Sequence, residues 1–161
     1  MFCPRCKTEL RKDKEGHFVC PDCGFTFYRN PRPTTSVVIK KDSKVLLAKR
    51  AIEPEKDKWD LLGGFLEYDE SPQECARREF KEETGLEIKI EDFLGFYMDR
   101  YFDPTNQIER SVLTLGFLAK VKNKKEPTPK DDVAELKWFE LNNLPDQFAF
   151  KNTRYFLNKV D

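Results

Sequence analysis

Short apolar runs separated by polar turns fill most of the chain after residue 33. The runs are rich in β-branched and aromatic residues, which is typical of buried strands. They comprise residues 34–40, 44–50, 90–103, 110–121 and 135–141. KDS forms a turn between the first two runs and DPTNQ separates the next pair, so hairpins are predicted there. A helix is predicted in the tail after Pro145, which ends RYFLNKV.

Another segment carries strong helix start and stop signals. Ser71 is placed as the N-cap, Pro72 at the first helical position, and Glu74 to close a capping box. Gly85 is placed to end the helix. We therefore predict a helix over residues 72–84.

Three glutamates crowd one face of this predicted helix. Glu82 and Glu83 lie three and four positions after Glu79, and like charges at these spacings repel and weaken a helix. Gly63 and Gly64 stand before the helix, and paired glycines let the backbone approach another group closely. Mg²⁺ between the carboxylates would relieve the repulsion, because it prefers oxygen ligands and keeps waters for a phosphate substrate. A solvated acidic helix is the alternative that these residues alone leave open.

Composition narrows the classes of partner. The 161 residues suit one domain with a small appendage, and 14 phenylalanines allow a core despite 36% charged residues. Because 29 basic and 29 acidic side chains give zero net charge, no long-range field favours DNA or anionic lipid. No apolar run approaches the ~18 residues of a membrane span. The first residues show no secretory pattern, so a cytoplasmic location is expected.

Four of the five cysteines form two CxxC pairs near the N-terminus. Thirteen residues separate the pairs, and in a reducing compartment such pairs are typical of one tetrahedral zinc site rather than of disulfides. The predicted zinc ligands are Cys3, Cys6, Cys20 and Cys23. Four thiolates leave no open position, so the zinc would be structural; free thiols in a disordered tail are the alternative. We predict a zinc ribbon over residues 1–30, a linker RNPRP at 29–33 and a second domain over 34–161.

A long spaced pattern runs from the paired glycines to the end of the predicted helix. It reads Gly64, five residues, Glu70, seven residues, Arg78-Glu79-Phe80, one residue, Glu82-Glu83, one residue and Gly85-Leu86. This resembles the complete 23-residue signature of the Nudix hydrolases, with every fixed position matched. The resemblance implies the Nudix α/β/α sandwich, here preceded by the ribbon. It also implies Mg²⁺- or Mn²⁺-dependent hydrolysis of the diphosphate linkage between a nucleoside diphosphate and another moiety.

The resemblance assigns roles to individual residues. The positions matching the family's magnesium ligands are Glu79, Glu82 and Glu83. A backbone carbonyl of Gly63 or Gly64 would be a further magnesium ligand, and we predict that of Gly64. Glu70 and Arg78 would orient the carboxylates through a salt bridge. Leu62 replaces the proline that usually precedes the glycines, which should alter loop stiffness more than chemistry.

Three further residues are candidates for the reaction. A further acid of the family often stands six residues before a tryptophan; Asp132 has this spacing to Trp138, whereas Glu135 is three residues before it. We take Asp132 as the acid that completes the metal site or serves as base. Arg50 ends a predicted strand and is a candidate phosphate contact, with a surface charge as the alternative. Tyr101 is a candidate for stacking on a base, with core packing as the alternative.

The substrate is less well defined by the sequence than the reaction. A four-cysteine ribbon before the signature resembles the NADH pyrophosphatase branch. The second signature of that branch, SQPWPFP, is absent, and the chain reads EIKIEDFLGFYMDRYFD in its place. Tyr101 replaces the proline expected of ADP-ribose pyrophosphatases, as in dinucleoside polyphosphate hydrolases. NADH or NAD, ADP-ribose and dinucleoside polyphosphates all stay candidates.

The expected partner is a small nucleoside diphosphate derivative, with no membrane involved. Nucleic acid is a less favoured partner, and a homodimer is left open. The competing hypothesis is a binding protein, in which the zinc ribbon binds nucleic acid or another protein and the Nudix domain is regulatory. The intact signature argues against this alternative.

Overall fold

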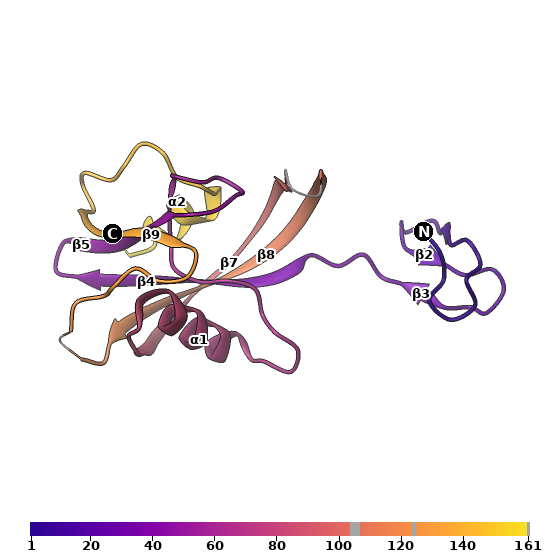
Figure 1. Ribbon diagram of the computed structural model, residues 1–161, viewed down its shortest axis with the longest axis horizontal. Helices are drawn as coiled ribbons and strands as arrows, with labels where there is room; N and C mark the ends of the chain where they lie inside the picture. The colour runs from indigo at the N-terminus through magenta and orange to yellow at the C-terminus, as the bar shows by residue number, and fades with distance from the viewer. Residues whose placement is uncertain (104–106, 124, 161) are drawn as a thin grey trace. The chain divides into compact units, whose positions relative to one another are not determined.

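The chain divides into two compact units, Met1–Pro31 and Arg32–Asp161 (Figure 1). The computed structural model describes residues 1–103, 107–123 and 125–160, except for the side chains of Tyr101 and Asp103.

The smaller unit is a three-stranded antiparallel sheet with long connecting loops. Its strands, in spatial order, are β1 (Arg11–Lys12), β2 (Phe18–Val19) and β3 (Thr26–Phe27). The buried core of this unit contains Cys3, Leu10 and Cys20, with Phe18 and Phe25 packed against them. So small a core is insufficient to stabilise a segment of this length, and a metal at the cysteines would provide the missing stabilisation.

The larger unit is an α/β sandwich. Its strands are β4 (Arg32–Lys41), β5 (Lys44–Arg50), β6 (Trp59–Asp60), β7 (Ile88–Asp103), β8 (Ile108–Val121) and β9 (Val133–Glu140). Its helices are α1 (Pro72–Thr84) and α2 (Lys151–Leu157). The strand order is β6-β5-β4-β8-β7, and β9 pairs with β5. β4 and β8 are parallel, whereas β7 and β8 form the predicted antiparallel hairpin, whose turn at 104–106 lies outside the described residues.

The longer strands of this unit lie where the apolar runs predict them, whereas the short strand β6 was not predicted and the start of β4 needs a correction. This strand begins at Arg32, inside the segment predicted as a linker. Arg32 and Pro33 pair with Val112 and Leu113 of β8. A partner strand distant in sequence therefore extends β4 beyond its own apolar run.

The two helices pack on opposite faces of the sheet (Figure 1). Val37 of β4 packs with Phe80 of α1 in one core, whereas Val38 packs with Phe156 of α2 in the other. Successive residues of a strand point to opposite faces, so β4 contributes to both cores. The predicted α/β/α sandwich is confirmed.

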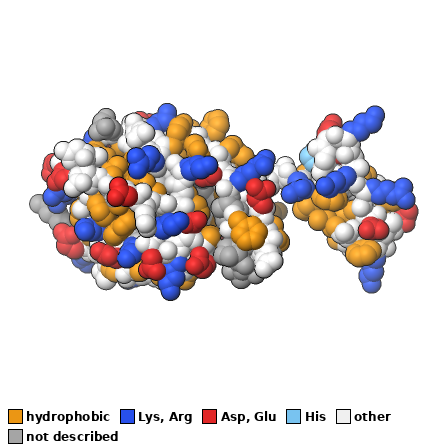
Figure 2. Space-filling view, turned by 90° about the horizontal axis from the view of Figure 1, so that it is seen from above, with side chains coloured by type: hydrophobic (Ala, Val, Ile, Leu, Met, Phe, Trp, Pro, Cys, Tyr) orange, Lys and Arg blue, Asp and Glu red, His pale blue; other side chains and the backbone are white. Residues whose placement is uncertain are grey.

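The surface of the larger unit is charged and mixed in sign. Figure 2 shows basic and acidic side chains interspersed over the face that it presents. None of the described helices has both the length and the apolar character needed to cross a membrane.

Candidate active site

The loop before α1 runs close to β4 and requires glycine at two positions. The Leu62 and Gly64 carbonyls accept the Val37 and Thr35 N–H groups, both at 2.8 Å. Gly63 has φ 140°, and a Cβ there would lie 2.2 Å from the Thr35 carbonyl oxygen. A Cβ on Gly64 would lie 2.4 Å from the Glu79 carboxyl group. The absence of side chains therefore lets this loop contact both β4 and α1.

Helix α1 begins and ends as its sequence predicts. The Ser71 side chain accepts from the Glu74 N–H, and the Glu74 side chain accepts in turn from the Ser71 N–H, forming the capping box. Gly85 ends the helix in the left-handed conformation, with φ 74°. These caps fix the glutamates relative to the glycine loop.

The three glutamates occupy different environments. Glu83 is buried, with 6% of its surface exposed, and its Oε2 accepts the Gly63 N–H at 2.9 Å. Glu79 is half-buried, whereas about half of the Glu82 side chain is exposed. The three glutamates keep the spacing of one helix face, but Glu83 is buried whereas Glu82 is exposed.

Arg78 links four groups around this helix face. Its Nε and Nη2 bind the two Glu70 oxygens at 2.8 and 2.9 Å. Its Nη1 binds Glu79 at 2.8 Å and Glu82 at 3.1 Å, and its Nη2 also donates to the Phe65 carbonyl at 3.1 Å. The ion pair between Glu70 and Arg78 that the resemblance implies is present and is bidentate.

Hydrogen bonding and burial shift the pKa values of these carboxyl groups in opposite directions. The Arg78 hydrogen bonds lower the pKa of Glu70 to about 2. Burial raises the pKa of Glu79, against the opposing influence of Arg78. Burial also raises the pKa of Glu83 well above its ordinary value, and Asp132 raises it further. The ionised form of Glu83 is therefore disfavoured in the metal-free protein, first by burial and then by the nearby Asp132 charge.

We expect Glu70→Gln to remove an acid-sensitive contribution to stability. The lowered Glu70 pKa means that the ion pair stabilises the fold above about pH 4.5, and this contribution is lost as the pH falls toward 2. The unfolding free energy at pH 7 should fall by about 2 kcal/mol. Denaturant titrations between pH 2 and 7 should show the difference from wild type shrinking with acid, while the exposed control Glu67→Gln changes little. A difference that does not vary with pH would contradict the assignment.

A cavity of about 370 Å³ opens beside the glycine loop in the larger unit. Its walls come from β4, β7, β8, the glycine loop, α1, the segments around residues 50–60 and 131–132, and the start of α2. The acidic residues that line it are Glu53, Asp60, Glu79, Asp99, Asp131 and Asp132. A cavity of this size is typical of small-molecule sites.

Asp132 reaches the cavity because the loop before β9 is tied to the end of α1. The Lys130 N–H donates to the Glu83 carbonyl at 3.0 Å. The Asp132 carbonyl accepts the Ala51 N–H at 2.7 Å. Glu135 is exposed on β9 and is not among the described cavity-lining residues. Of the two sequence candidates, only Asp132 is thus placed beside the glutamates.

Arg50 lines the cavity at an irregularity in the pairing of β5 with β9. Its Nε donates to the Pro54 carbonyl at 2.8 Å, and its Nη1 lies 3.8 Å from Asp60 Oδ2. A bulge commonly redirects a side chain next to an active site. The Tyr101 side chain lies outside the described residues, so stacking of Tyr101 on a base stays a prediction. Tyr97 lies in the same strand, and its ring centroid is 4.9 Å from that of Tyr155.

Sequence reasoning missed Asp60. It is buried, and its Oδ1 accepts the Thr153 hydroxyl at 2.6 Å and the Leu61 N–H at 2.8 Å. Burial raises the pKa of Asp60 to about 6, against the influence of Thr153 and Arg50. The sequence feature that could have identified Asp60 as a site residue is its position as an acid among the apolar residues Trp59, Leu61 and Leu62, directly before the paired glycines.

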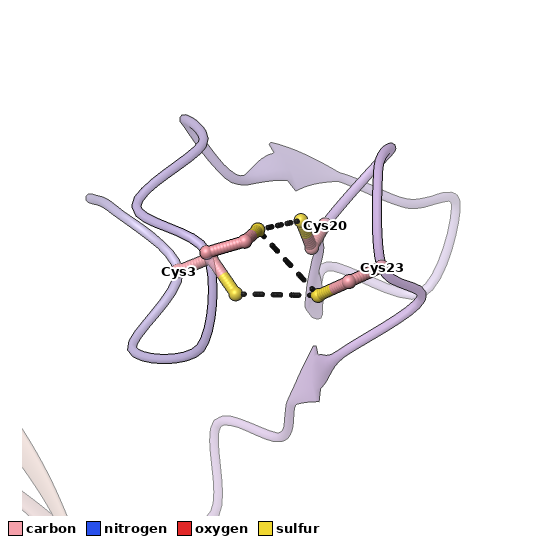
Figure 3. Close-up of side chains that lie close together, drawn as sticks. Cys3, Cys20 and Cys23 are labelled. Atoms are coloured by element: carbon pink, nitrogen blue, oxygen red, sulfur yellow. Dashed lines mark hydrogen bonds between the residues drawn. The ribbon is translucent and has the colours of Figure 1, made fainter.

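The four N-terminal cysteines face one another in the smaller unit. Their sulfur atoms all lie within 4.8 Å, with Cys3–Cys23 and Cys6–Cys20 separations of 3.6 and 3.4 Å. Figure 3 shows Cys3, Cys20 and Cys23 pointing toward a common centre. A tetrahedron with zinc–sulfur bonds of about 2.3 Å has edges near ~3.8 Å. The cluster therefore fits zinc, and within the described chain it is the one group of potential ligands gathered this closely.

Two similar turns present these cysteines. The Lys7 N–H donates to the Cys3 carbonyl at 2.9 Å, and the Gly24 N–H donates to the Cys20 carbonyl at 3.1 Å. Both turn residues have left-handed backbones, with φ 64° at Lys7 and 71° at Gly24. Glycine adopts this conformation readily, and Lys7 adopts it without being glycine.

A family model described as NUDIX domain matches residues 30–159. The chain belongs to the Nudix family. The match includes the glycine loop, α1 and the segment carrying Asp132, so the Nudix domain contains the whole cavity described above.

Two relatives of this Nudix chain illustrate the range of names. It is 37% identical over 130 residues to a protein named ADP-ribose pyrophosphatase from Methanocaldococcus jannaschii, covering 81% of this chain and 73% of that protein. It is 30% identical over 145 residues to NAD-capped RNA hydrolase NudC from Pseudomonas aeruginosa, covering 89% of this chain but 49% of that protein. The chain therefore spans about half the length of the latter relative.

Solved Nudix structures share the fold. A NUDIX hydrolase from Nitrosomonas europaea matches with a TM-score of 0.77 at 28% identity, covering 97% of this chain and 87% of that one. A UDP-X diphosphatase matches with a TM-score of 0.66 at 27% identity, covering 83% of this chain and 64% of that one. The predicted Nudix fold and membership of a hydrolase family are confirmed.

Proposed function

We propose that this Nudix hydrolase cleaves the diphosphate linkage of a nucleoside diphosphate derivative with the help of Mg²⁺ or Mn²⁺. The observation that carries the proposal is the convergence of acids from separate segments. Glu79 of α1 and Asp132 before β9 line one cavity, and the Asp132 charge acts on the buried Glu83. Hydrolysis of a diphosphate needs acids that can hold a divalent cation, because the charge of the diphosphate repels an attacking hydroxide.

The chemistry of these donors fits a hard divalent cation. Carboxylate oxygens are the ligands that Mg²⁺ prefers. Because residue 64 is glycine, the space beside the Glu79 carboxyl group that a Cβ would fill stays open. Burial raises the pKa of Glu83, and the Asp132 charge raises it further; a bound cation would oppose both effects by favouring the ionised carboxylate. When bound, Mg²⁺ would neutralise the charge of the diphosphate and lower the pKa of a water molecule bound to it.

The side chains of the chain itself would position the reacting groups. Arg78 holds Glu79 and Glu82 with one nitrogen and Glu70 with two others, which fixes these three carboxylates. The Gly63 N–H holds Glu83 Oε2, so Glu83 Oε1 would be left for a ligand. Preorganised carboxylates of this kind cost little reorganisation when substrate binds.

A backbone carbonyl completes the proposed metal site. The Gly64 carbonyl already accepts from the Thr35 N–H at 2.8 Å and lies 3.6 Å from the Cys75 thiol. No hydrogen bond to the Gly63 carbonyl is found among the described residues. The carbonyls on either side of it, those of Leu62 and Gly64, both point toward β4, and successive carbonyls of an extended segment alternate in direction, so the Gly63 carbonyl points away from β4. Of the two glycines, we therefore propose Gly63 as the better donor.

Asp132→Asn should slow hydrolysis strongly if Asp132 takes the proton from water. Loss of a positioned base typically costs about 10²-fold or more in turnover. The amide keeps nearly the same shape, so KM and the thermal midpoint should change little. Steady-state kinetics of this variant should be compared with Glu135→Gln, whose exposed carboxylate lies outside the cavity lining. Equal effects of the two variants would remove Asp132 from this role.

We propose ADP-ribose as a substrate at least as good as NADH. The second signature of the NADH branch is absent from the sequence, and the archaeal relative is named ADP-ribose pyrophosphatase. The test is a panel of NADH, NAD, ADP-ribose and dinucleoside polyphosphates with Mg²⁺, with products separated by chromatography. The proposed function requires a nucleoside monophosphate among the products, and a clear preference for NADH would overturn the substrate assignment.

The four cysteines are proposed to hold structural zinc. Their tetrahedral sulfur spacing and the small core of their unit support this role. We propose that the ribbon covers residues 1–30, as predicted, and that the Nudix domain begins at Arg32, where β4 starts, rather than at residue 34.

Binding by the ribbon is a second candidate function. Phe2, Phe27 and Tyr28 are exposed on it, and Arg5 lies 5.4 Å from the Phe25 ring centroid. Aromatic and basic side chains together are typical of single-stranded nucleic-acid sites. Salt-dependent RNA binding, without turnover of any diphosphate, would favour this function over hydrolysis.

A further inference from the structure

A second hollow, of about 600 Å³, adjoins the cavity in the larger unit. Among the described lining residues, the two spaces share Glu53, Pro54, Asp99 and Phe150, whereas the glycine loop and α1 line only the first. A ligand that is bound at the glutamates can therefore extend over the shared residues into this hollow.

The charges around the two spaces differ in sign. The cavity is lined by the six acids named above and by Arg50, which already binds the Pro54 carbonyl and faces Asp60 at 3.8 Å. The second space, which we call the basic hollow, has four basic and three acidic side chains among its described lining residues. The basic ones are Lys56, Lys58, Arg100 and Lys151. An anionic group is therefore favoured in the basic hollow, whereas the cavity needs a metal ion before it can hold one.

Three of the four basic groups have no anionic partner within the described chain. Lys58 pairs with Glu55. For the charged groups of Lys56, Arg100 and Lys151, no ion pair or hydrogen bond is found in the part of the chain that the structure describes, and all three residues are exposed. Cations that are not already paired attract an incoming anion and need break no existing contact to bind it.

Separate elements bring these three cations to the basic hollow. Lys56 lies in the loop between β5 and β6, Arg100 on β7, and Lys151 at the first position of α2. The Ala149 N–H donates to the Trp59 carbonyl at 2.8 Å, which ties the chain before α2 to β6 at the end of this loop. The convergence of the cations therefore comes from the fold and not from a run of basic residues.

The chemistry of the basic hollow fits a single phosphate group. Ammonium and guanidinium groups bind phosphate through charge-assisted hydrogen bonds, and a phosphate monoester offers about two negative charges and three acceptor oxygens to several donors. A long polyanion fits less well, because three acids line the same hollow and the net charge of the chain is zero. Phe102 and Phe150 supply an apolar wall for the group that carries the phosphate.

We propose that the basic hollow binds a further phosphate of the substrate, outside the diphosphate that is cleaved. This assignment rests on the proposed function, because it assumes that the diphosphate of the same molecule lies at the glutamates. The preferred substrate is then a nucleoside diphosphate derivative whose nucleoside, or whose second moiety, is itself phosphorylated. Lys56, Arg100 and Lys151 select this substrate and take no part in the chemical step.

Calorimetry in the presence of Mg²⁺ tests this subsite without requiring turnover, through ligands that differ by one phosphate. AMP is compared with its 2′- and 3′-phosphorylated forms, and ribose 5-phosphate with ribose 1,5-bisphosphate. In at least one comparison, wild type should bind the bisphosphate about 10-fold more tightly at low salt, as expected for two or three exposed ion pairs. The comparison that shows this gain identifies which part of the substrate is phosphorylated. The gain should shrink as salt rises, because exposed charges are screened.

Variants of the cations make the result decisive. Lys151→Gln and Arg100→Gln should each reduce the gain by about 2- to 5-fold, and the double variant should abolish it. Lys41→Gln is the matched control, because Lys41 is exposed at the end of β4 and lies outside both described linings, so this variant should keep the gain of wild type. Equal binding of every mono- and bisphosphate by wild type, or a gain that the folded double variant retains, would overturn the phosphate subsite. The proposed function would fail separately, through absence of turnover of every diphosphate in the panel.

Discussion

Glu83→Gln is expected to remove nearly all hydrolysis while leaving the fold intact. A metal-held carboxylate contributes several kcal/mol to the transition state, so kcat should fall by at least about 10²-fold. The amide oxygen can still accept the Gly63 N–H, and the variant removes a buried acid that lies near Asp132. The unfolding free energy at pH 7 without metal should therefore stay equal or rise.

The measurement pairs kcat with thermal unfolding of the metal-free protein. Glu82→Gln should also lose activity by orders of magnitude, although its carboxylate is more exposed. Glu87→Gln is the matched control, because Glu87 lies just beyond the helix and pairs with Lys81 and Lys122 on the surface. Near wild-type activity of Glu83→Gln in a folded protein would show that the metal assignment is wrong.

Cys20→Ser is expected to abolish zinc binding and to unfold the smaller unit. Structural zinc supplies on the order of 10 kcal/mol or more to small domains, and the core of this unit includes Cys20 itself. Amide exchange should show loss of protection within residues 1–31. The larger unit has its own two cores, so Mg²⁺-dependent hydrolysis should persist.

Cys75→Ser is the matched control for zinc content. Cys75 is buried against Thr35 in the larger unit, with 3.3 Å between Sγ and Oγ1, so this variant should retain the zinc of wild type. The zinc ribbon would be refuted if wild-type protein from zinc-supplemented growth contained no zinc and the amides of its smaller unit were still protected from exchange.

The fold was predictable where local sequence decides structure. Apolar runs rich in β-branched and aromatic residues located the longer strands of the larger unit, and Ser71, Glu74 and Gly85 set the ends of α1 through contacts within a few residues. The ion pair between Glu70 and Arg78 followed from the resemblance. These features depend on spacing that is visible in the chain.

The unequal burial of the glutamates and the polar part of the cavity could not be predicted in this way. Asp60 is bonded by Thr153, which is 93 positions away, and Asn152 contacts Ser36 across 116 positions. Only the packing of α2 on the sheet brings these groups together. Asp132 was selected from the sequence by its spacing, but its position beside Glu83 depends on the loop that is tied to α1.

The central claim is that water attacks the diphosphate at the Mg²⁺-dependent carboxylate site. The most direct measurement is hydrolysis of the preferred substrate in ¹⁸O-labelled water, with and without Mg²⁺, followed by mass spectrometry of both products. We predict that ¹⁸O enters the phosphate of one product, and only when the divalent cation is present. Attack by water would be contradicted if neither product carried ¹⁸O in its phosphate. The role of the cation would be contradicted if labelling continued at the same rate after the cation was removed.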